Sequence, residues 1–184
     1  MTHRSTHIPG DVSLIGMASL NAFQLDTLHD IYLEAFPPEE RRPWDDIAGD
    51  RGPRLLAIVA DGKPAGLLTH WRLGTFEYIE HLAVDSALRS AGIGSVALDM
   101  FVAAAGMPVV LEVEKPASSV IAARRVGFYS RHGFRVISTT YIQPPYAPGL
   151  PEVPLDLMST DPRLCPDEVS RALHHRVYQR FNIS

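Results

Sequence analysis

The feature that most constrains this sequence is a loop of small residues between a predicted strand and a predicted helix. An apolar run ends at Val84, and apolar residues at helical spacing follow from Ser95 onward. The loop between them contains Arg89, Gly92 and Gly94. The first amides of a helix lack partners within the helix, and the helix dipole adds partial positive charge there. Because the glycines allow close approach to the backbone and the arginine adds a fixed charge, the loop predicts a pyrophosphate site.

Two known patterns compete for this loop. Gly92, Gly94 and Ala97 satisfy the dinucleotide fingerprint G-x-G-x-x-A, and acidic residues follow about 20 positions later. In dinucleotide-binding folds, however, the glycines follow the strand almost at once, whereas here the polar residues 85–91 intervene. The motif also lies in the middle of the chain, and no second βαβ half follows it. A dinucleotide-dependent oxidoreductase is therefore the less favoured interpretation.

Arg89, Gly92 and Gly94 also match every specified position of the pattern Arg/Gln-x-x-Gly-x-Gly/Ala. A second segment, residues 128–134 (FYSRHGF), matches Tyr-x-x-x-Gly-Phe after the next predicted strand. With both motifs, the sequence resembles the GNAT superfamily of N-acetyltransferases over roughly residues 55–135. The resemblance implies an α/β fold with a mixed, mostly antiparallel sheet, splayed at its centre and flanked by helices. It also implies acetyl-CoA as co-substrate.

The order of predicted elements agrees with such a fold. Strands are predicted at residues 13–20, 54–60, 65–73, 75–84, 108–113, 134–142 and 153–158. Helices are predicted at residues 25–36, at a short segment ending near residue 48, and at residues 94–104, 119–132 and 164–182. We expect one domain over residues 1–184, with residues 1–11 frayed.

The resemblance assigns co-substrate contacts to the loop and to the strand before it. The pyrophosphate is expected over the loop residues Arg89, Ser90, Ala91, Gly92, Ile93, Gly94 and Ser95. The pantetheine and the thioester are expected beside the backbone of Leu82, Ala83 and Val84. These three residues also suit ordinary core positions, because only their backbone is needed.

Acetyl transfer to an ammonium group needs a base, and the departing thiolate benefits from an acid. By resemblance Tyr129 is the acid, and the alternative is a core tyrosine with a satisfied hydroxyl. Glu80 and Glu112 are carboxylates within apolar strands, where burial would raise their pKa values toward neutrality. Glu112 also resembles the strand glutamate of the ribosomal-protein N-terminal acetyltransferases. Either carboxylate is a candidate base, acting directly or through a water, and either would instead be a surface residue if its strand is half exposed.

The acceptor is expected to be a primary amine of a small molecule, a peptide or a protein. The resemblance implies that residues 39–44 border the acceptor pocket. The proline-rich residues 143–151 are expected to cover it from another side. A non-catalytic sensor that binds acyl-CoA is the alternative from another class. The two strand carboxylates together with Tyr129 favour an enzyme.

Composition limits the partners and the compartment. A net charge of -4 argues against a general nucleic-acid binder. The single cysteine, Cys165, excludes an intrachain disulfide, and the scattered histidines predict no metal site. The sequence shows neither a signal peptide nor an apolar run of about 18 residues, so a cytoplasmic protein without membrane contacts is expected. A monomer or a homodimer fits these observations equally.

Overall fold

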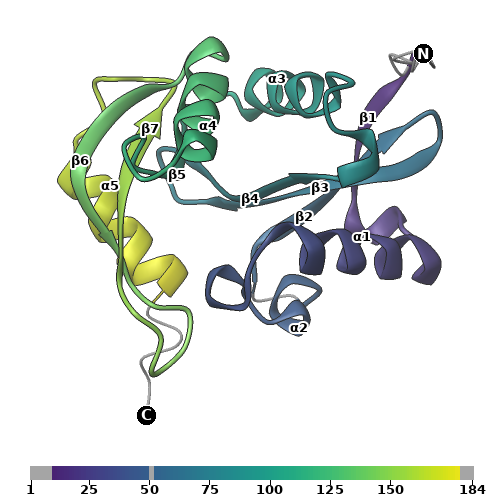
Figure 1. Cartoon of the computed structure of the whole chain (residues 1–184), viewed down its shortest axis with the longest axis horizontal. Helices are drawn as coiled ribbons and strands as arrows, with labels where there is room; N and C mark the ends of the chain where they lie inside the picture. Colours follow the sequence, from purple (N-terminus) through teal and green to yellow (C-terminus); the bar gives the residue numbers. More distant parts are fainter. Residues whose placement is uncertain (1–9, 50–51, 179–184) are drawn as a thin grey trace. The chain divides into compact units, whose positions relative to one another are not determined.

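The computed structural model describes residues 10–49 and 52–178 and shows a mixed α/β fold (Figure 1). The strands are β1 (Val12–Gly16), β2 (Arg54–Ala60), β3 (Lys63–Arg72), β4 (Glu77–Val84), β5 (Val109–Glu114), β6 (Arg135–Gln143) and β7 (Val153–Ser159). The α-helices are α1 (Ala22–Ala35), α2 (Trp44–Ile47), α3 (Ile93–Ala105), α4 (Val120–Arg131) and α5 (Pro166–Leu173). A π-helical turn, η4 (His174–Tyr178), continues α5.

The strands form one sheet in the order β1-β2-β3-β4-β5-β7-β6. The β1–β2, β5–β7 and β7–β6 pairs are antiparallel, and the β4–β5 pair is parallel. This confirms the predicted mixed, mostly antiparallel sheet. The contacts within the chain define two compact units, and both β3 and β4 pass from one unit into the other.

The first unit carries α1 and α3 on opposite faces of its strands (Figure 1). On one face, α1 packs Leu28 and Tyr32 into a core that includes Ala83 of β4. On the other face, Ile93 and Ala97 of α3 pack with β2 and β3, and the side chains of β4 that point this way join them. The apolar residues of β4 are therefore used on both faces, as expected for a central strand.

The second unit contains β5, β6 and β7 with the end of β3, the start of β4, and the helices α4 and α5. Its main core is rich in aromatic side chains, and it is closed by Val169 and Leu173 of α5 and by Val177 and Tyr178 of η4. The aromatic members of this core are Trp71, Phe76, Tyr78, Tyr141, Tyr146 and Tyr178. Four of these six rings carry a hydroxyl group, so this core has to satisfy polar atoms as well as bury apolar surface.

The parallel pairing of β4 with β5 is short. It joins Glu77–Ile79 to Val109–Leu111, while β4 continues to Val84 and β5 to Glu114. On its other side β5 stays paired with β7 from Val110 to Glu114. The pairs described for β4 and β5 thus stop midway along both strands, and the central splay stays a prediction.

The C-terminal helix differs from the expectation of one helix over residues 164–182. It is α-helical over Pro166–Leu173 and continues as the π turn η4, and residues 179–182 lie outside the described part of the chain. Its apolar residues recur every four positions. In an α-helix, each step of four residues rotates the side-chain direction about 40° beyond a full turn. The wider π turn brings Val177 back toward the core, and both Val177 and Tyr178 are buried.

Candidate active site

The predicted phosphate loop is a sharp turn after β4. Asp85 closes its first bend by accepting a hydrogen bond from the Ala87 amide at 2.8 Å. Ser90 and Gly92 both adopt left-handed backbone geometry, with φ of 72° and 81°. The Val96 amide then donates to the Gly92 carbonyl at 3.1 Å, which makes the first hydrogen bond of α3. A left-handed residue immediately before the helix explains why a glycine stands there.

The first amides of α3 lack partners among the described residues. No described group accepts a hydrogen bond from the amides of Gly92, Ile93 or Gly94. A side chain built at Gly92 would meet no atom within 4 Å. Arg89 is exposed beside this turn, and its Nε donates to the Val84 carbonyl at 3.4 Å. Free amides and a nearby guanidinium are groups that can bind a phosphate, and the pyrophosphate site over residues 89–95 stays a prediction.

The end of β4 supplies backbone rather than side chains to this region. Leu82 and Val84 pack into the core under α3, and Ala83 packs into the core under α1. Their side chains are therefore occupied by packing, which leaves the main chain as the part available to a ligand. The predicted contact of these three residues with pantetheine and thioester stays a prediction.

Replacing Gly92 by valine should weaken CoA binding by about 10- to 100-fold, since the side chain would hinder hydrogen bonds between a phosphate and the amides. The same change at Gly62 is the matched control. Gly62 has φ of 77° and also has open space around it, but it lies in the turn between β2 and β3. Titration calorimetry with CoA measures both variants. Equal affinities for both would remove the anion site from this loop.

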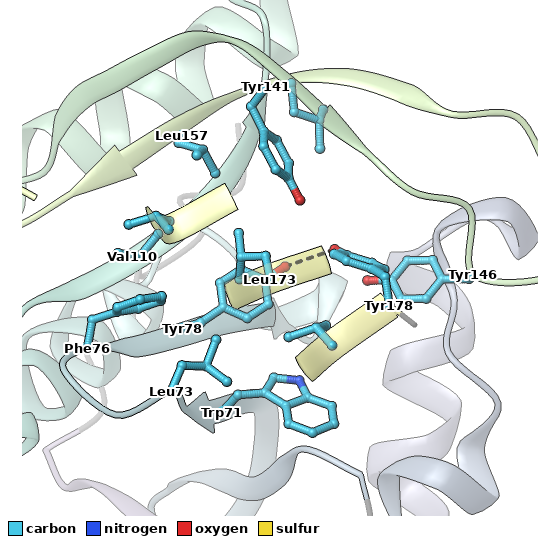
Figure 2. Packing of buried hydrophobic residues seen from close by; sticks show 13 residues of the cluster. Trp71, Leu73, Phe76, Tyr78, Val110, Tyr141, Tyr146, Leu157, Leu173 and Tyr178 are labelled. Atoms are coloured by element: carbon cyan, nitrogen blue, oxygen red, sulfur yellow. Dashed lines mark hydrogen bonds between the residues drawn. The ribbon is translucent and has the colours of Figure 1, made fainter. Parts of the chain in front are cut away.

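Glu112 lies on β5 with its carboxyl group inside the aromatic core of the second unit. Its Oε2 accepts hydrogen bonds from the hydroxyls of Tyr178 at 2.6 Å and Tyr78 at 2.9 Å. The hydroxyls of Tyr78, Tyr141 and Tyr178 point into the same region between the strands and η4 (Figure 2). A carboxyl group in such a place is buried but still surrounded by hydrogen-bond donors.

The other oxygen of this carboxyl group, Oε1, has no hydrogen-bond donor in the described part of the chain. Among the described residues, Glu112 Oε1 and the Tyr141 hydroxyl are both shielded from solvent without a hydrogen-bond partner. The Tyr141 hydroxyl nevertheless favours the charged form of this carboxyl group and so acts to lower its pKa. One oxygen of Glu112 is thus held by two donors, whereas the other has no donor in hydrogen-bonding geometry.

Burial is the main influence on the acidity of Glu112. It raises the pKa of this carboxyl from 4.5 to about 7, and the negative charge of Glu80 adds to the rise. The surrounding tyrosine hydroxyls act in the opposite direction, since they stabilise the charged form. A carboxyl group with this pKa exchanges protons near neutral pH, which is what a general base requires.

Glu80, the second candidate base, is held in an ion pair. Its Oε1 accepts from Arg42 at 3.0 Å (Nε) and 2.6 Å (a terminal nitrogen), and its Oε2 accepts from Trp71 Nε1 at 2.8 Å. The Arg42 side chain is 2% exposed and the Glu80 side chain 0%. Because both oxygens already accept hydrogen bonds and a buried arginine balances the charge, this geometry favours a structural role for Glu80.

Arg42 brings together three distant parts of the second unit. Besides Glu80, it donates to the Val177 carbonyl at 3.1 Å. Its guanidinium also lies over the rings of Trp71 and Tyr146, at 5.2 and 5.4 Å from their centroids. Arg42 therefore contacts the loop that carries Tyr146, and an acceptor pocket bordered by these two segments stays a prediction. Arg42 itself, however, is buried in the core, so its position does not support a contact between this residue of the 39–44 segment and the acceptor.

Tyr129 lies on α4 and packs against aromatic side chains. Its ring packs between Phe128 and Phe134, at centroid distances of 5.2 and 5.8 Å. Among the described residues none makes a hydrogen bond to its hydroxyl. Burial raises the pKa of this phenol above 10, against a smaller lowering effect of Arg125. Tyr129 thus keeps its proton at neutral pH, and its proposed role as an acid stays a prediction.

Two further expectations concern metals and membranes. Within residues 10–49 and 52–178, no group of three or more His, Cys, Asp or Glu side chains is arranged to hold a metal ion. In the same part of the chain no helix has the length and apolar character needed to cross a membrane.

The strand order and the loop after β4 define an acetyltransferase fold, and comparison with known proteins agrees. The model of the acetyltransferase (GNAT) family matches residues 13–134, more than half of the chain. This chain therefore belongs to the GNAT family of acetyltransferases. The family match favours the acetyltransferase interpretation of the loop over the dinucleotide one. No protein of curated function matches the sequence.

Solved structures show the same relationship. A protein from Bacteroides thetaiotaomicron, described as a GNAT-family acetyltransferase, is 32% identical, with 91% of this chain and 98% of that chain covered and a TM-score of 0.81. An acetyltransferase from Bacillus subtilis in complex with CoA is 15% identical, with 82% and 99% covered and a TM-score of 0.59. The ribosomal-protein-S18-alanine N-acetyltransferase of Escherichia coli is 20% identical, with 81% and 92% covered and a TM-score of 0.55. The last two likenesses concern the fold alone.

Proposed function

We propose that this acetyltransferase moves the acetyl group of acetyl-CoA directly to a primary amine of a small molecule, a peptide or a protein. Membership of the family establishes acetyl transfer in general. The observation that supports an amine as the acceptor is the buried carboxyl group of Glu112, which has a pKa of about 7. An ammonium group has to lose a proton before it attacks, and a carboxylate of this basicity can accept it at neutral pH.

The co-substrate is assigned from the loop of this chain. Acetyl-CoA, when bound, supplies the acetyl group and the sulfur leaving group. The amides of residues 92–94 and the Arg89 guanidinium supply hydrogen bonds and charge to the pyrophosphate. The backbone of Leu82, Ala83 and Val84 is proposed to align the pantetheine. The CoA complex of the Bacillus subtilis protein agrees with this assignment, although at 15% identity it contributes only the fold.

Two side chains of the second unit would handle protons. Glu112 accepts the proton of the acceptor, and Oε1 is the oxygen with capacity for it. Tyr129 holds a proton at neutral pH that it can donate to the leaving group. The sequence contains no nucleophile motif, so transfer without an acyl-enzyme is the simpler route. We further propose that the protein acts in the cytoplasm, as a monomer or a homodimer, without binding nucleic acid or membranes.

Thermal unfolding with a panel of acetyl-CoA, CoA, NAD and NADP tests the co-substrate. A ligand that binds only the folded state raises the melting temperature, by about 2.7 kcal/mol of added stability at 100 times its Kd. We expect acetyl-CoA and CoA to raise it and the two dinucleotides to leave it unchanged. A rise with NAD or NADP alone would overturn the proposal. With acetyl-CoA binding established, release of free CoA in the presence of candidate amines identifies the acceptor.

A further inference from the structure

Tyr178 lies at the end of the described chain, far in sequence from the strand that carries Glu112. It donates the shorter of the two hydrogen bonds to Glu112 Oε2, 2.6 Å against 2.9 Å for Tyr78. We propose that Tyr178 is a positioning residue for Glu112, which holds Oε2 and so leaves Oε1 as the oxygen that takes the proton. This inference rests on the proposed function of Glu112 as the base.

The hydrogen-bond pattern gives Glu112 a fixed orientation. Both tyrosine donors act on the same oxygen, and their own oxygens are 3.1 Å apart. Glu112 Oε1 has no hydrogen-bond partner among the described residues. A half turn of the carboxylate would exchange two identical oxygens, so one oxygen would still accept from both tyrosines and the other from neither. The two oxygens are therefore distinct as long as the donors stay in place.

The turn that carries Tyr178 is itself held by buried contacts. The Val177 carbonyl accepts a hydrogen bond from Arg42 at 3.1 Å. The Tyr178 side chain is fully buried, and its ring lies 5.4 Å from the ring of Tyr146. The turn is a π-helix, a rare geometry that often occurs at functional sites. A hydroxyl fixed in this way loses little freedom when it bonds to the carboxylate.

The sign of the effect follows from the groups around Glu112. Burial and the negative charge of Glu80 favour the protonated form of the carboxyl group. The hydroxyls of Tyr141, Tyr178 and Tyr78 favour its charged form. Among the described residues, other ionisable groups here include Tyr146, His174 against the ring of Tyr141, and Arg42, which is paired with Glu80. Removing the Tyr178 hydroxyl therefore raises the pKa of Glu112.

The test is a titration of Glu112 in the protein without ligands. Tyr178→Phe removes one oxygen and keeps the ring. The carboxyl carbon of labelled Glu112, assigned by its absence in Glu112→Gln, reports the protonation state by NMR. A hydrogen bond to a charged group predicts a rise in its midpoint by about one to two pH units. The acid limb of kcat/KM should move by the same amount, with activity recovered at higher pH.

Two further variants make the result specific. Tyr32→Phe removes an equally buried hydroxyl, which lies 3.3 Å from His81 Nε2, and should leave the Glu112 midpoint unchanged. Incorporation of 3-fluorotyrosine at position 178 makes the donor more acidic and should lower the midpoint, the opposite of phenylalanine. This variant decides the question if Tyr178→Phe does not fold.

Different results would overturn the positioning role of Tyr178 and the role of Glu112 as the base. A midpoint that stays within a few tenths of a pH unit in both Tyr178 variants would overturn the positioning role, even if Glu112→Gln is inactive. Full activity in Glu112→Gln would instead overturn the base, whatever the titration shows.

Discussion

Replacing Glu112 by glutamine is expected to lower kcat by about 10²- to 10⁴-fold at neutral pH, because the amide cannot accept the proton of the ammonium group. Glutamine has the same shape and can still accept a hydrogen bond from Tyr178 or Tyr78. Binding of acetyl-CoA should change little, since the loop of residues 89–95 is untouched. The measurement is kcat with an identified amine, together with calorimetry for the co-substrate. A kcat close to that of the parent would leave Glu112 as a buried structural residue.

The same variant should be more stable than the parent at alkaline pH. The pKa of Glu112 is 4.5 ordinarily and about 7 in the folded protein. The folded state therefore binds the proton more tightly, and the parent loses stability as pH rises from about 4.5 through 7. A difference of about 2.5 in pKa corresponds to about 3 kcal/mol. Glutamine does not ionise, so the melting temperature of Glu112→Gln should exceed that of the parent at pH 8 and approach it at pH 5.

Glu80→Gln is the matched control for this prediction. It makes the same chemical change on the neighbouring strand, but Glu80 balances the buried charge of Arg42. Removing one member of a buried ion pair destabilises a protein, because the other charge remains buried. We expect this variant to melt at a lower temperature, the reverse of Glu112→Gln, and any loss of activity to follow the loss of folded protein.

Replacing Tyr129 by phenylalanine is expected to lower kcat by about 10²- to 10⁴-fold without disturbing the fold. The pKa of its hydroxyl is raised by burial, so it holds a proton across the neutral range. The ring, which packs against Phe128 and Phe134, remains in the variant. Because no described group bonds to this hydroxyl, its removal should cost little stability.

Three measurements decide the role of Tyr129. The melting temperature should stay near that of the parent, and acetyl-CoA affinity should stay within a few-fold. The decisive value is kcat with a confirmed amine acceptor. If it is unchanged, Tyr129 is a core residue and the leaving group takes its proton from water.

Much of the fold could be predicted from the sequence because local signals were strong. The strand predicted at residues 54–60 agrees with β2, and the turn after it has left-handed geometry at Asp61 and Gly62. The first helix ends at Ala35 because Phe36, which precedes a proline, is extended. The loop between β4 and α3 was equally clear, since an arginine and two glycines at fixed spacing lie at the start of a helix.

The surroundings of the two carboxylates could not be predicted in this way. Glu112 receives its donors from Tyr78, which is 34 residues away, and from Tyr178, which is 66 residues away. Arg42 bonds to a carbonyl group 135 residues away. Neither periodicity nor a short motif reports such pairs, because they form only when several strands and the C-terminal turn pack together. The sequence offered both strand glutamates as candidate bases, with a family resemblance for Glu112 alone, and the packing shows how differently the two side chains are held.

The π turn at the end of the described chain lies outside residues 13–134, which match the family model. Tyr141, Tyr146 and Tyr178 lie beyond that segment as well. The loop of residues 89–95 and most of the groups around Glu112 are thus encoded in separate parts of the gene, and mutation can alter one without altering the other. Tyrosine and phenylalanine codons differ by a single base. If Tyr178 sets the pKa of Glu112 as proposed, a single nucleotide change at position 178 would shift the working pH, while the coding sequence for residues 89–95 stays the same.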